Sequence, residues 1–425
     1  MHIEGYIPRI ADEVVSSYLR SFGAVCVEGP KWCGKTWTAK RQAESAFMVG
    51  DPAGNFQNRR LAETDVTIPM QGKTPHLIDE WQEVPQLWDA TRACVDSTAE
   101  KGRYILTGSS TPNRKGVMHT GTGRIGSLRM GTMSLWELGE SKGKVSLAAL
   151  CRNELPAAQL DEPPTLQRLA ELVVRGGWPG AIGVPFKDAV NIPREYIRQV
   201  VNNDIQRLDN VKRDVRKVNL LMKSLARNET TSVSIKTLCR DISEVDEETV
   251  DTDTLSTYLD ALERMFVIEN QPPFDANIRS STRVKQSPKR HFCDPSIACA
   301  LLKLTPEKLI GDLQTFGFMF EAMVERDLRA YCLGMGAELF HYQDYANKEL
   351  DAVIETADGD WAAIEIKLGA NQEDEAAENL IAIRDAIVAD GKRAPKALIA
   401  IIGKASATYR RADGVIVCSP LHLRP

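Results

Sequence analysis

The stretch VEGPKWCGKTW, from Val27 to Trp37, decides how the N-terminal part of this chain is expected to fold. Within it, Gly29 to Thr36 matches the phosphate-binding pattern GxxxxGK[ST]. The run before it, Gly23 to Gly29, is short, apolar and Val-rich, as in a buried parallel strand. The run after it, Lys35 to Ala46, is compatible with a helix. A loop between such a strand and a helix N-terminus binds phosphate, because the backbone N–H groups there have no partner within the helix.

The motif predicts an ATP site that uses Mg2+. Lys35 is expected to reach the β and γ phosphates, and Thr36 to ligate Mg2+. The predicted nucleotide-binding residues are Gly29, Pro30, Lys31, Trp32, Cys33, Gly34, Lys35, Thr36 and Trp37.

A second element strengthens this prediction. PHLIDEWQEVP, from Pro75 to Pro85, contains a short apolar strand that ends in Asp79 and Glu80. In a P-loop ATPase, Asp79 would hold Mg2+ through water, and Glu80 would polarise the attacking water as general base. The alternative is an acidic pair that caps a helix starting near Trp81.

A third strand is predicted at RYILTGSS, Arg103 to Ser110, which is apolar and then rich in hydroxyl groups. Thr107 and Ser109 are candidates for sensing the γ phosphate from the end of this strand. A hydroxyl-stabilised turn at a strand end would explain either residue equally well.

The segment from Gly121 to Leu138 alternates like an exposed strand and contains Arg124 and Arg129. Either arginine could act as an arginine finger that neutralises transition-state charge across a subunit boundary, which would require self-association. Surface ion pairs are the alternative for both.

The middle of the chain favours helices. Residues 141–213 are expected to form a helical lid over the nucleotide, and from Val215 the pattern is helix, helix, helix and hairpin, as in a winged helix. Basic residues of the hairpin would suit phosphate contacts on DNA, whereas the acidic third helix would repel them, and winged helices also dock proteins. The basic residues are Arg279, Arg283, Lys285, Lys289 and Arg290, and the acidic ones are Asp253, Asp260 and Glu263.

The C-terminal third contains a second constellation of charged residues. An amphipathic helix from Phe316 to Leu333 places Glu321 and Glu325 one turn apart. Asp351 opens a strand, and Glu365 and Lys367 lie two residues apart in the next strand, so they point to one side of the sheet. This pattern resembles the PD-(D/E)xK nuclease superfamily.

That resemblance implies a second Mg2+ site and catalysis on DNA. Glu321, Asp351 and Glu365 would hold the metal, and Lys367 would orient the water or the phosphate. Solvated strand charges are the usual cause of such a pattern. Activity stays open, because Ala352 follows Asp351 where related ATPases have a bulky apolar residue, and because the helix after the motif is acidic.

Composition sets the class of protein. The chain has 425 residues and a formal net charge of -5, so it is not a uniformly basic nucleic-acid coat. Its nine cysteines form no CxxC pair, which is typical of reduced thiols. The N-terminus does not resemble a leader, and no apolar run approaches the roughly 18 residues needed to span a bilayer. We therefore expect a soluble, cytoplasmic protein without a membrane partner.

The order of GPKWCGKT, DPA (51–53), LIDEWQEVP, ILTGSS, GR and SLWEL closely resembles predicted bacterial and archaeal ATPases of the AAA superfamily. In those proteins the ATPase is joined to a C-terminal region of unknown function. The later VVRGGWPGAIG (173–183) and EYIRQVVNNDIQRL (195–208) resemble that family's GGxP turn and following helix. The resemblance implies ATP binding and hydrolysis within an oligomer or a switch.

Together these patterns predict an α/β protein of four parts. They are a P-loop ATPase core with a parallel sheet (1–140), a helical lid (141–213), a winged helix (214–295) and a restriction-endonuclease-like α/β domain (296–425). The predicted function is an ATPase whose nucleotide state controls a DNA-directed, nuclease-like domain. The alternative is a nucleotide-operated switch or scaffold that binds a protein partner, with an inactive nuclease-like domain.

Overall fold

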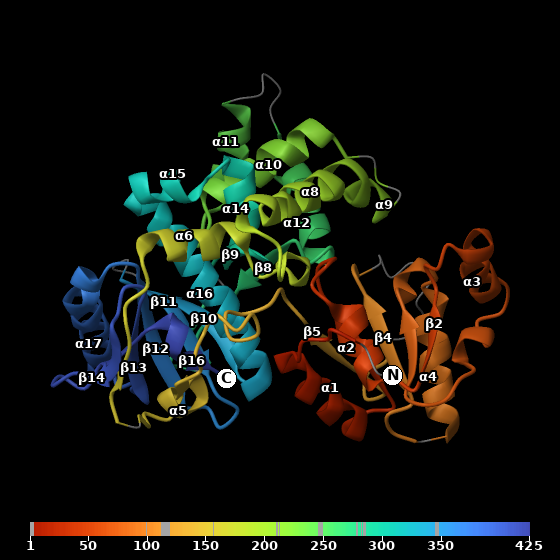
Figure 1. The fold of residues 1–425 in the computed structure, drawn as a ribbon, viewed down its shortest axis with the longest axis horizontal. Helices are drawn as coiled ribbons and strands as arrows, with labels where there is room; N and C mark the ends of the chain where they lie inside the picture. Colours follow the sequence, from red (N-terminus) through yellow and green to blue (C-terminus); the bar gives the residue numbers. More distant parts are fainter. Residues whose placement is uncertain are drawn as a thin grey trace. The chain divides into compact units, whose positions relative to one another are not determined.

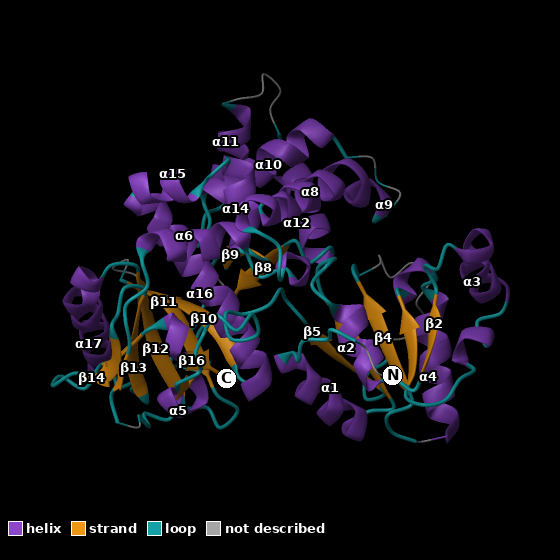
Figure 2. Cartoon of the chain, in the orientation of Figure 1, coloured by secondary structure: helices purple, strands orange, loops and turns teal. Residues whose placement is uncertain are grey.

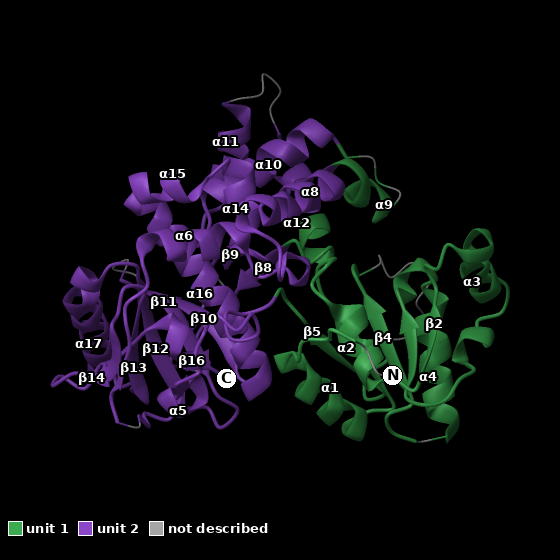
Figure 3. Cartoon of the chain, in the orientation of Figure 1, with its two compact units in different colours: residues 1–132, 202–213, 260–267 green, residues 133–201, 214–259, 268–425 purple. Residues whose placement is uncertain are grey.

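The chain forms two compact units, shown in Figure 3. Unit 1 contains residues 1–132, 202–213 and 260–267, and unit 2 contains residues 133–201, 214–259 and 268–425. The computed structural model describes residues 4–98, 100–111, 120–155, 157–209, 211, 213–244, 250–277, 279–281, 283, 286–344 and 348–425.

Unit 1 is built on a five-stranded parallel sheet with the order β2-β3-β4-β1-β5 (Figure 2). The predicted parallel sheet is confirmed, because the apolar runs before the glycine loop, before Asp79 and before Ser109 are all buried strands. The strands are β1 (Ala24–Glu28), β2 (Ser45–Met48), β3 (His76–Asp79), β4 (Tyr104–Gly108) and β5 (Ile125–Arg129).

Helices pack on this sheet around an apolar core (Figure 1). Cys26 from β1, Ile78 from β3 and Leu106 from β4 are fully buried in that core, together with Leu87 from the helix after β3. The helices are α1 (Ile10–Ser21), α2 (Lys35–Gln42), α3 (Ala53–Thr64) and α4 (Gln86–Thr98). Unit 1 also contains the short helix α9 (Ile205–Arg207) from residues 202–213.

Unit 2 contains a seven-stranded sheet with the order β10-β11-β12-β13-β15-β14-β7. Its first three strands are antiparallel neighbours, whereas β12, β13 and β15 run parallel. The long helices α16 (Leu313–Met335) and α17 (Glu373–Ala389) pack on it. The strands are β7 (Gln159–Leu160), β10 (Glu338–Gln343), β11 (Glu349–Glu355), β12 (Trp361–Lys367), β13 (Ala397–Ile402), β14 (Ala407–Arg410) and β15 (Ile416–Cys418).

The rest of unit 2 is mainly helical. The expected order of three helices and a hairpin is present as α10 (Val215–Arg227), α11 (Ile235–Ser243), α12 (Thr252–Arg264), β8 (Ile268–Gln271) and β9 (Lys289–Phe292). The last residues of α12 belong to unit 1. Other helices are α5 (Leu147–Cys151), α6 (Leu166–Arg175), α7 (Phe186–Ala189), α8 (Asn191–Gln199), a π-helical turn (Val200–Asp204), α14 (Pro295–Leu302) and α15 (Pro306–Gly311).

The structure groups the predicted lid, residues 141–213, differently from the sequence prediction. Short strands from this region join the C-terminal part of the chain: β7 lies at the edge of the seven-stranded sheet, and β6 (Val145–Ser146) pairs with β16 (Leu423–Arg424). The apolar face of α6, with Leu169 and Val173 buried, packs on α14, α15 and α16. Residues 202–213 are the part of this region that belongs to unit 1.

Within the described ranges, none of the helices has the length and apolar character needed to cross a bilayer.

Candidate functional site

The loop between β1 and α2 has the backbone geometry of an anion-binding turn. Gly29 and Gly34 have φ angles of +152° and +102°, and Gly34 is the N-cap of α2. A Cβ on Gly29 would lie 2.0 Å from the carbonyl oxygen of Met130. The close approach of β5 therefore explains why a glycine is needed at this position.

Lys35 and the first turn of α2 supply positive charge and N–H donors. The Lys35 side chain is buried, and its Nζ donates to the carbonyl oxygen of Pro30 in the same loop at 2.7 Å. The first turn of α2 contains no acidic residue. Because N–H groups at a helix N-terminus lack partners within the helix, this turn favours an anion. These groups fit the phosphates of a nucleotide.

Asp79, at the end of β3, accepts hydrogen bonds from two hydroxyl groups. The Oγ1 atoms of Thr36 and Thr107 donate to its Oδ1 at 2.8 and 2.7 Å. Burial raises the pKa of Asp79, while the two hydroxyl hydrogen bonds act in the opposite direction. Thr36, at the start of α2, and Asp79 are thereby brought to one point, as an ATPase with bound Mg2+ requires.

Glu80 has a left-handed backbone conformation, with φ +58° and ψ 48°. Its N–H donates to Thr107 Oγ1 at 3.1 Å, and its Oε2 accepts from Ser109 Oγ at 2.9 Å and from the Gln82 amide. A residue other than glycine in this conformation is strained, and such strain is concentrated at functional sites. The structure therefore links both predicted sensor residues, Thr107 and Ser109, to the acidic pair.

Arg9 supports the loop and was not predicted from the sequence. Its guanidinium donates to the carbonyl oxygen of Cys33 at 2.7 Å and to those of Gly131 and Thr132 at 3.1 and 3.3 Å. Arg9 is buried just ahead of α1. No local pattern marks it, because its partners are main-chain groups far away in the sequence.

The loop residues between the two glycines differ in exposure. Cys33 is buried and lies against the Met130 carbonyl oxygen at 3.5 Å. Trp32 is 50% exposed, and Trp37, in the first turn of α2, is 49% exposed. Lys31 forms an ion pair with Asp204 at 2.7 Å.

Arg124 and Arg129 both have partners within unit 1. Arg124 Nε lies 2.7 Å from Asp96 Oδ1, in an exposed ion pair. Arg129 lies 4.6 Å from the centroid of the Phe266 ring and donates to the Glu263 carbonyl oxygen at 3.4 Å. That either arginine neutralises transition-state charge at the nucleotide of a second subunit stays a prediction.

The second carboxylate site lies in unit 2 where β11 and β12 meet. Lys367 Nζ is 2.8 Å from Glu365 Oε2 and 3.6 Å from Asp351 Oδ2. Asp351 also accepts from the Ile366 N–H at 2.7 Å, and Glu365 accepts from Asn379 of α17 at 2.8 Å. The three residues predicted on these strands are therefore brought together.

Glu321 and Glu325 on α16 face a buried lysine. Lys289 Nζ forms an ion pair with Glu321, lies 3.0 Å from Glu325 Oε1 and donates to the Asp351 carbonyl oxygen at 3.2 Å. Burial opposes the charge of Lys289, but the surrounding carboxylates hold its pKa above the ordinary value. The ammonium group of Lys289 therefore pairs with Glu321, one of the three residues predicted to hold a metal ion.

The residues of this site do not fit a divalent metal as they stand. Among the residues that the structure describes, no three His, Cys, Asp or Glu side chains are placed to hold a metal ion. Burial raises the pKa of Glu365 to about 8, and Asp351 adds to the shift, whereas Lys367 acts in the opposite direction. A metal ligand must be deprotonated, so a raised pKa disfavours metal binding by Glu365.

Basic residues of the predicted wing are engaged within the fold. Arg283 pairs with Glu355 at 3.0 Å through both terminal nitrogens and stacks on Phe274. Arg290 donates to the Val233 carbonyl oxygen at 2.6 Å, and Lys289 is buried as described above. Lys285 lies outside the described residues. The described basic side chains thus give little support to the expected phosphate contacts, because most of them already have partners.

Three family models match separate parts of the chain. Residues 21–139 match an AAA domain, residues 166–308 match a domain of unknown function (DUF8612), and residues 316–422 match another domain of unknown function (DUF4143). The AAA match covers the glycine loop, Asp79 and Glu80, and supports a P-loop ATPase domain in unit 1.

The chain is also similar to individual proteins and to a solved structure. It is 24% identical over 335 residues to uncharacterized proteins of Mycobacterium bovis and Mycobacterium tuberculosis, covering 78% of this chain and 67% of each relative. A solved structure, the Walker-type ATPase of Pyrococcus abyssi, covers 70% of this chain and 97% of its own, at 14% identity and a TM-score of 0.43. The two family models at residues 21–139 and 316–422, together with the geometry of the glycine loop, support an AAA-type P-loop ATPase domain joined to a C-terminal domain of unknown function.

Proposed function

We propose that unit 1 binds and hydrolyses ATP with Mg2+. The observation that carries the proposal is the convergence of Thr36 and Thr107 on one oxygen of Asp79, at 2.8 and 2.7 Å. Thr36 and Asp79 would hold Mg2+, which neutralises charge on the phosphates when bound. Lys35 and the N–H groups of the first turn of α2 would bind the phosphate oxygens.

Glu80 would accept a proton from the water that attacks the γ phosphate. Ser109 and Gln82 hold its carboxylate by hydrogen bonds, so its position is set before a nucleotide arrives. Positioning of the base and the water accounts for much of the rate in this class of reaction. Thr107 links Glu80 to Asp79, because its hydroxyl accepts from the first and donates to the second.

Steady-state ATP hydrolysis with and without Mg2+ tests this proposal. Asp79→Asn should lower kcat by about 100-fold or more, because one carboxylate charge next to the metal is lost. Asp188→Asn is the matched control, since Asp188 is exposed in unit 2 and should turn over ATP like the wild type. Turnover that is independent of Mg2+, or equal in both variants, would contradict the proposed site.

For the C-terminal part of unit 2 we propose a nuclease-like fold that does not cut DNA. The chain would then act as a nucleotide-operated switch that docks a protein partner. Support comes from Lys289, whose ammonium pairs with Glu321 and Glu325, and from Lys367, which pairs with Glu365. Each lysine offsets one negative charge of its carboxylate pair, which weakens the attraction of the site for a divalent cation.

Cleavage assays distinguish this proposal from the DNA-directed alternative. The full chain would be incubated with single-stranded, duplex and branched DNA, with Mg2+ or Mn2+, and with or without ATP. We expect intact DNA and an ATPase rate that DNA does not change. Mg2+-dependent cleavage by the wild type that disappears in Asp351→Ala would establish the nuclease instead.

A further inference from the structure

Two segments far along the chain fold with the ATPase core. Residues 202–213 and 260–267 belong to unit 1, although some 70 residues or more separate them from Thr132, the end of its first part (Figure 3). The family model of the AAA domain ends at residue 139 and does not include them. The question is what these two segments do for the nucleotide site.

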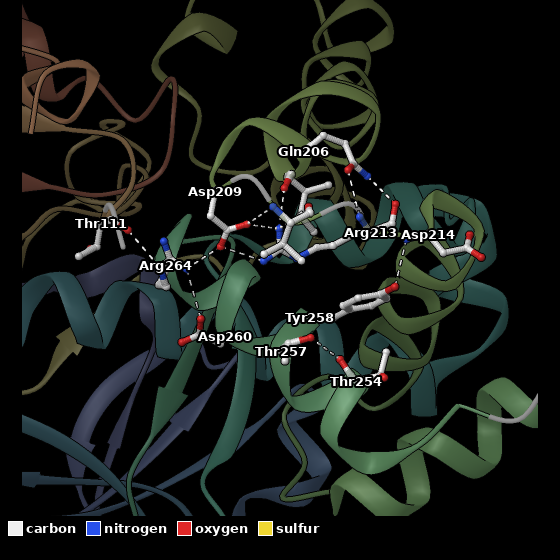
Figure 4. A network of polar contacts seen from close by, with 12 residues as sticks. Thr111, Gln206, Asp209, Arg213, Asp214, Thr254, Thr257, Tyr258, Asp260 and Arg264 are labelled. Carbon is white, nitrogen blue, oxygen red and sulfur yellow. Dashed lines mark hydrogen bonds and ion pairs between the residues drawn. The ribbon is translucent and has the colours of Figure 1, made fainter. Parts of the chain in front are cut away.

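Arg264, the last residue of α12, is bound to Thr111 at two points. The Thr111 N–H donates to the Arg264 carbonyl oxygen at 2.8 Å, and Arg264 Nε donates to the Thr111 carbonyl oxygen at 3.1 Å. Figure 4 shows the Arg264 side chain between Thr111 and Asp209. The main chain at Thr111 is therefore fixed by both the backbone and the side chain of Arg264.

Asp209 holds Arg264 in this position. Its Oδ2 lies 2.9 Å from Arg264 and 3.0 Å from Arg213, and its Oδ1 lies 2.7 Å from Arg213 (Figure 4). All three side chains are largely buried. Hydrogen bonds from Arg213 are the main reason that the pKa of Asp209 lies below its ordinary value. The carboxylate is thus charged and binds both guanidinium groups.

The segment 202–213 has hydrogen bonds between its own residues and also contacts the phosphate loop. Gln206 exchanges hydrogen bonds with the main chain of Arg213 at 2.7 and 3.1 Å. Asp204, two residues earlier, forms the ion pair with Lys31 between the two glycines of the loop. One segment therefore contacts the phosphate loop and, through Asp209 and Arg264, the end of β4.

The end of β4 is where the candidate base is oriented. Ser109, whose hydroxyl donates to Glu80 at 2.9 Å, lies two residues before Thr111. A shift of the main chain at Thr111 would displace Ser109, because only one residue separates them. Arg264 thus influences the position of the Glu80 carboxylate through the backbone from Thr111 to Ser109 and the Ser109 hydroxyl group.

We propose that Arg264 is a positioning residue for ATP hydrolysis, which fixes the end of β4 so that Ser109 orients Glu80. Asp209 is the anchor that keeps Arg264 in place. The inference rests on the proposed ATPase function of unit 1.

ATPase kinetics of the full chain test the proposal, with the affinity for a fluorescent ATP analogue measured in parallel. Arg264→Ala should lower kcat about 10- to 100-fold, as expected when a catalytic group is misplaced by a distant change. KM and the analogue Kd should stay within about two-fold, since the partners of Arg264 among the described residues, Thr111, Asp209 and Asp260, lie outside the phosphate loop. The kcat of Arg264→Lys should lie between those of the wild type and Arg264→Ala, because lysine keeps the charge near Asp209 but loses the planar set of donors.

Two aspartates that pair with Arg264 provide a matched pair of variants. Asp209 is buried and lies 2.9 Å from Arg264, whereas Asp260 is 63% exposed and lies 3.5 Å away. Asp209→Asn should lower kcat like Arg264→Ala, and the double variant should be no slower than either single one. Asp260→Asn should match the wild type.

The outcomes separate the inference from the function on which it rests. An active wild type with unchanged kcat in Arg264→Ala would overturn the positioning role and leave the ATPase intact. A parallel loss of analogue binding would also overturn it, because the effect would then be structural. A wild type that binds the analogue but does not turn over ATP would overturn the proposed function and the inference together.

Discussion

Replacing Lys289 with methionine would remove the positive charge from the carboxylates of unit 2 and keep a side chain of similar length. Lys289 Nζ contacts Glu321, lies 3.0 Å from Glu325 Oε1 and donates to the Asp351 carbonyl oxygen at 3.2 Å. The side chain of Glu325 is fully buried, and that of Glu321 is 13% exposed. Lys289→Met would therefore leave two buried carboxyl groups without their ammonium partner.

The size of the effect follows from the burial of these groups. Removing one partner of a buried ion pair typically costs about 3–5 kcal/mol, because the remaining charge is uncompensated. Burial raises the pKa values of Glu321 and Glu325 while Lys289 lowers them, so the variant would raise them further. Carboxyls with raised pKa values in the folded state stabilise it at low pH, and this contribution is lost as the pH rises. We therefore expect a loss of about 3–5 kcal/mol at pH 8 and a smaller loss at pH 5.

Hydrogen exchange of the buried β12 amides would measure the free energy of local opening at both pH values. Lys187→Met is the control, because Lys187 is exposed in the same unit and its replacement should change that free energy by less than about 0.5 kcal/mol. A loss below about 1 kcal/mol at pH 8, or an equal loss at pH 5 and pH 8, would refute the reasoning that Lys289 neutralises buried carboxylates.

Three further changes have defined outcomes. Glu80→Gln should lower kcat by about 100-fold or more while ATP binding stays within about two-fold, measured by turnover and by a fluorescent analogue. Gly29→Ala should abolish analogue binding, because the new Cβ would lie 2.0 Å from the Met130 carbonyl oxygen. Wild-type affinity in this variant would show that the main chain at Met130 can move away from the new Cβ. Since burial raises the pKa of Glu365 from 4.5 to about 8, its contribution to stability is lost as pH rises through that range. Urea denaturation at pH 5 and pH 8 should show a smaller pH dependence for Glu365→Gln than for the wild type.

The nucleotide site could be predicted because its parts are local in the sequence. The glycine loop, the strand before it and the helix after it are contiguous, and Asp79 and Glu80 stand at the end of an apolar run. Parallel strands then bring these ends to one edge of the sheet. The contact between Thr36 and Asp79 follows from this arrangement, so the sequence was enough to predict that these two residues lie together.

Contacts between distant segments could not be predicted in the same way. Arg9 binds main-chain carbonyl groups, which have no pattern in the sequence. Lys289 was grouped with basic residues of an exposed hairpin, because nothing in β9 itself shows that it faces Glu321 on α16. The short strand β7 likewise joins a sheet whose other strands begin at residue 338, and two residues carry too little periodicity to predict that pairing.

ATP turnover by Lys35→Ala tests the central claim most directly. Lys35 is buried within the phosphate loop and bonds to the Pro30 carbonyl oxygen at 2.7 Å, so the alanine variant should keep the fold of unit 1 and lose the charge that binds phosphate. We predict that the purified wild type hydrolyses ATP only with Mg2+, and that Lys35→Ala shows no turnover above background. Equal turnover in the wild type and in Lys35→Ala would contradict the assignment of this loop as the site of ATP hydrolysis.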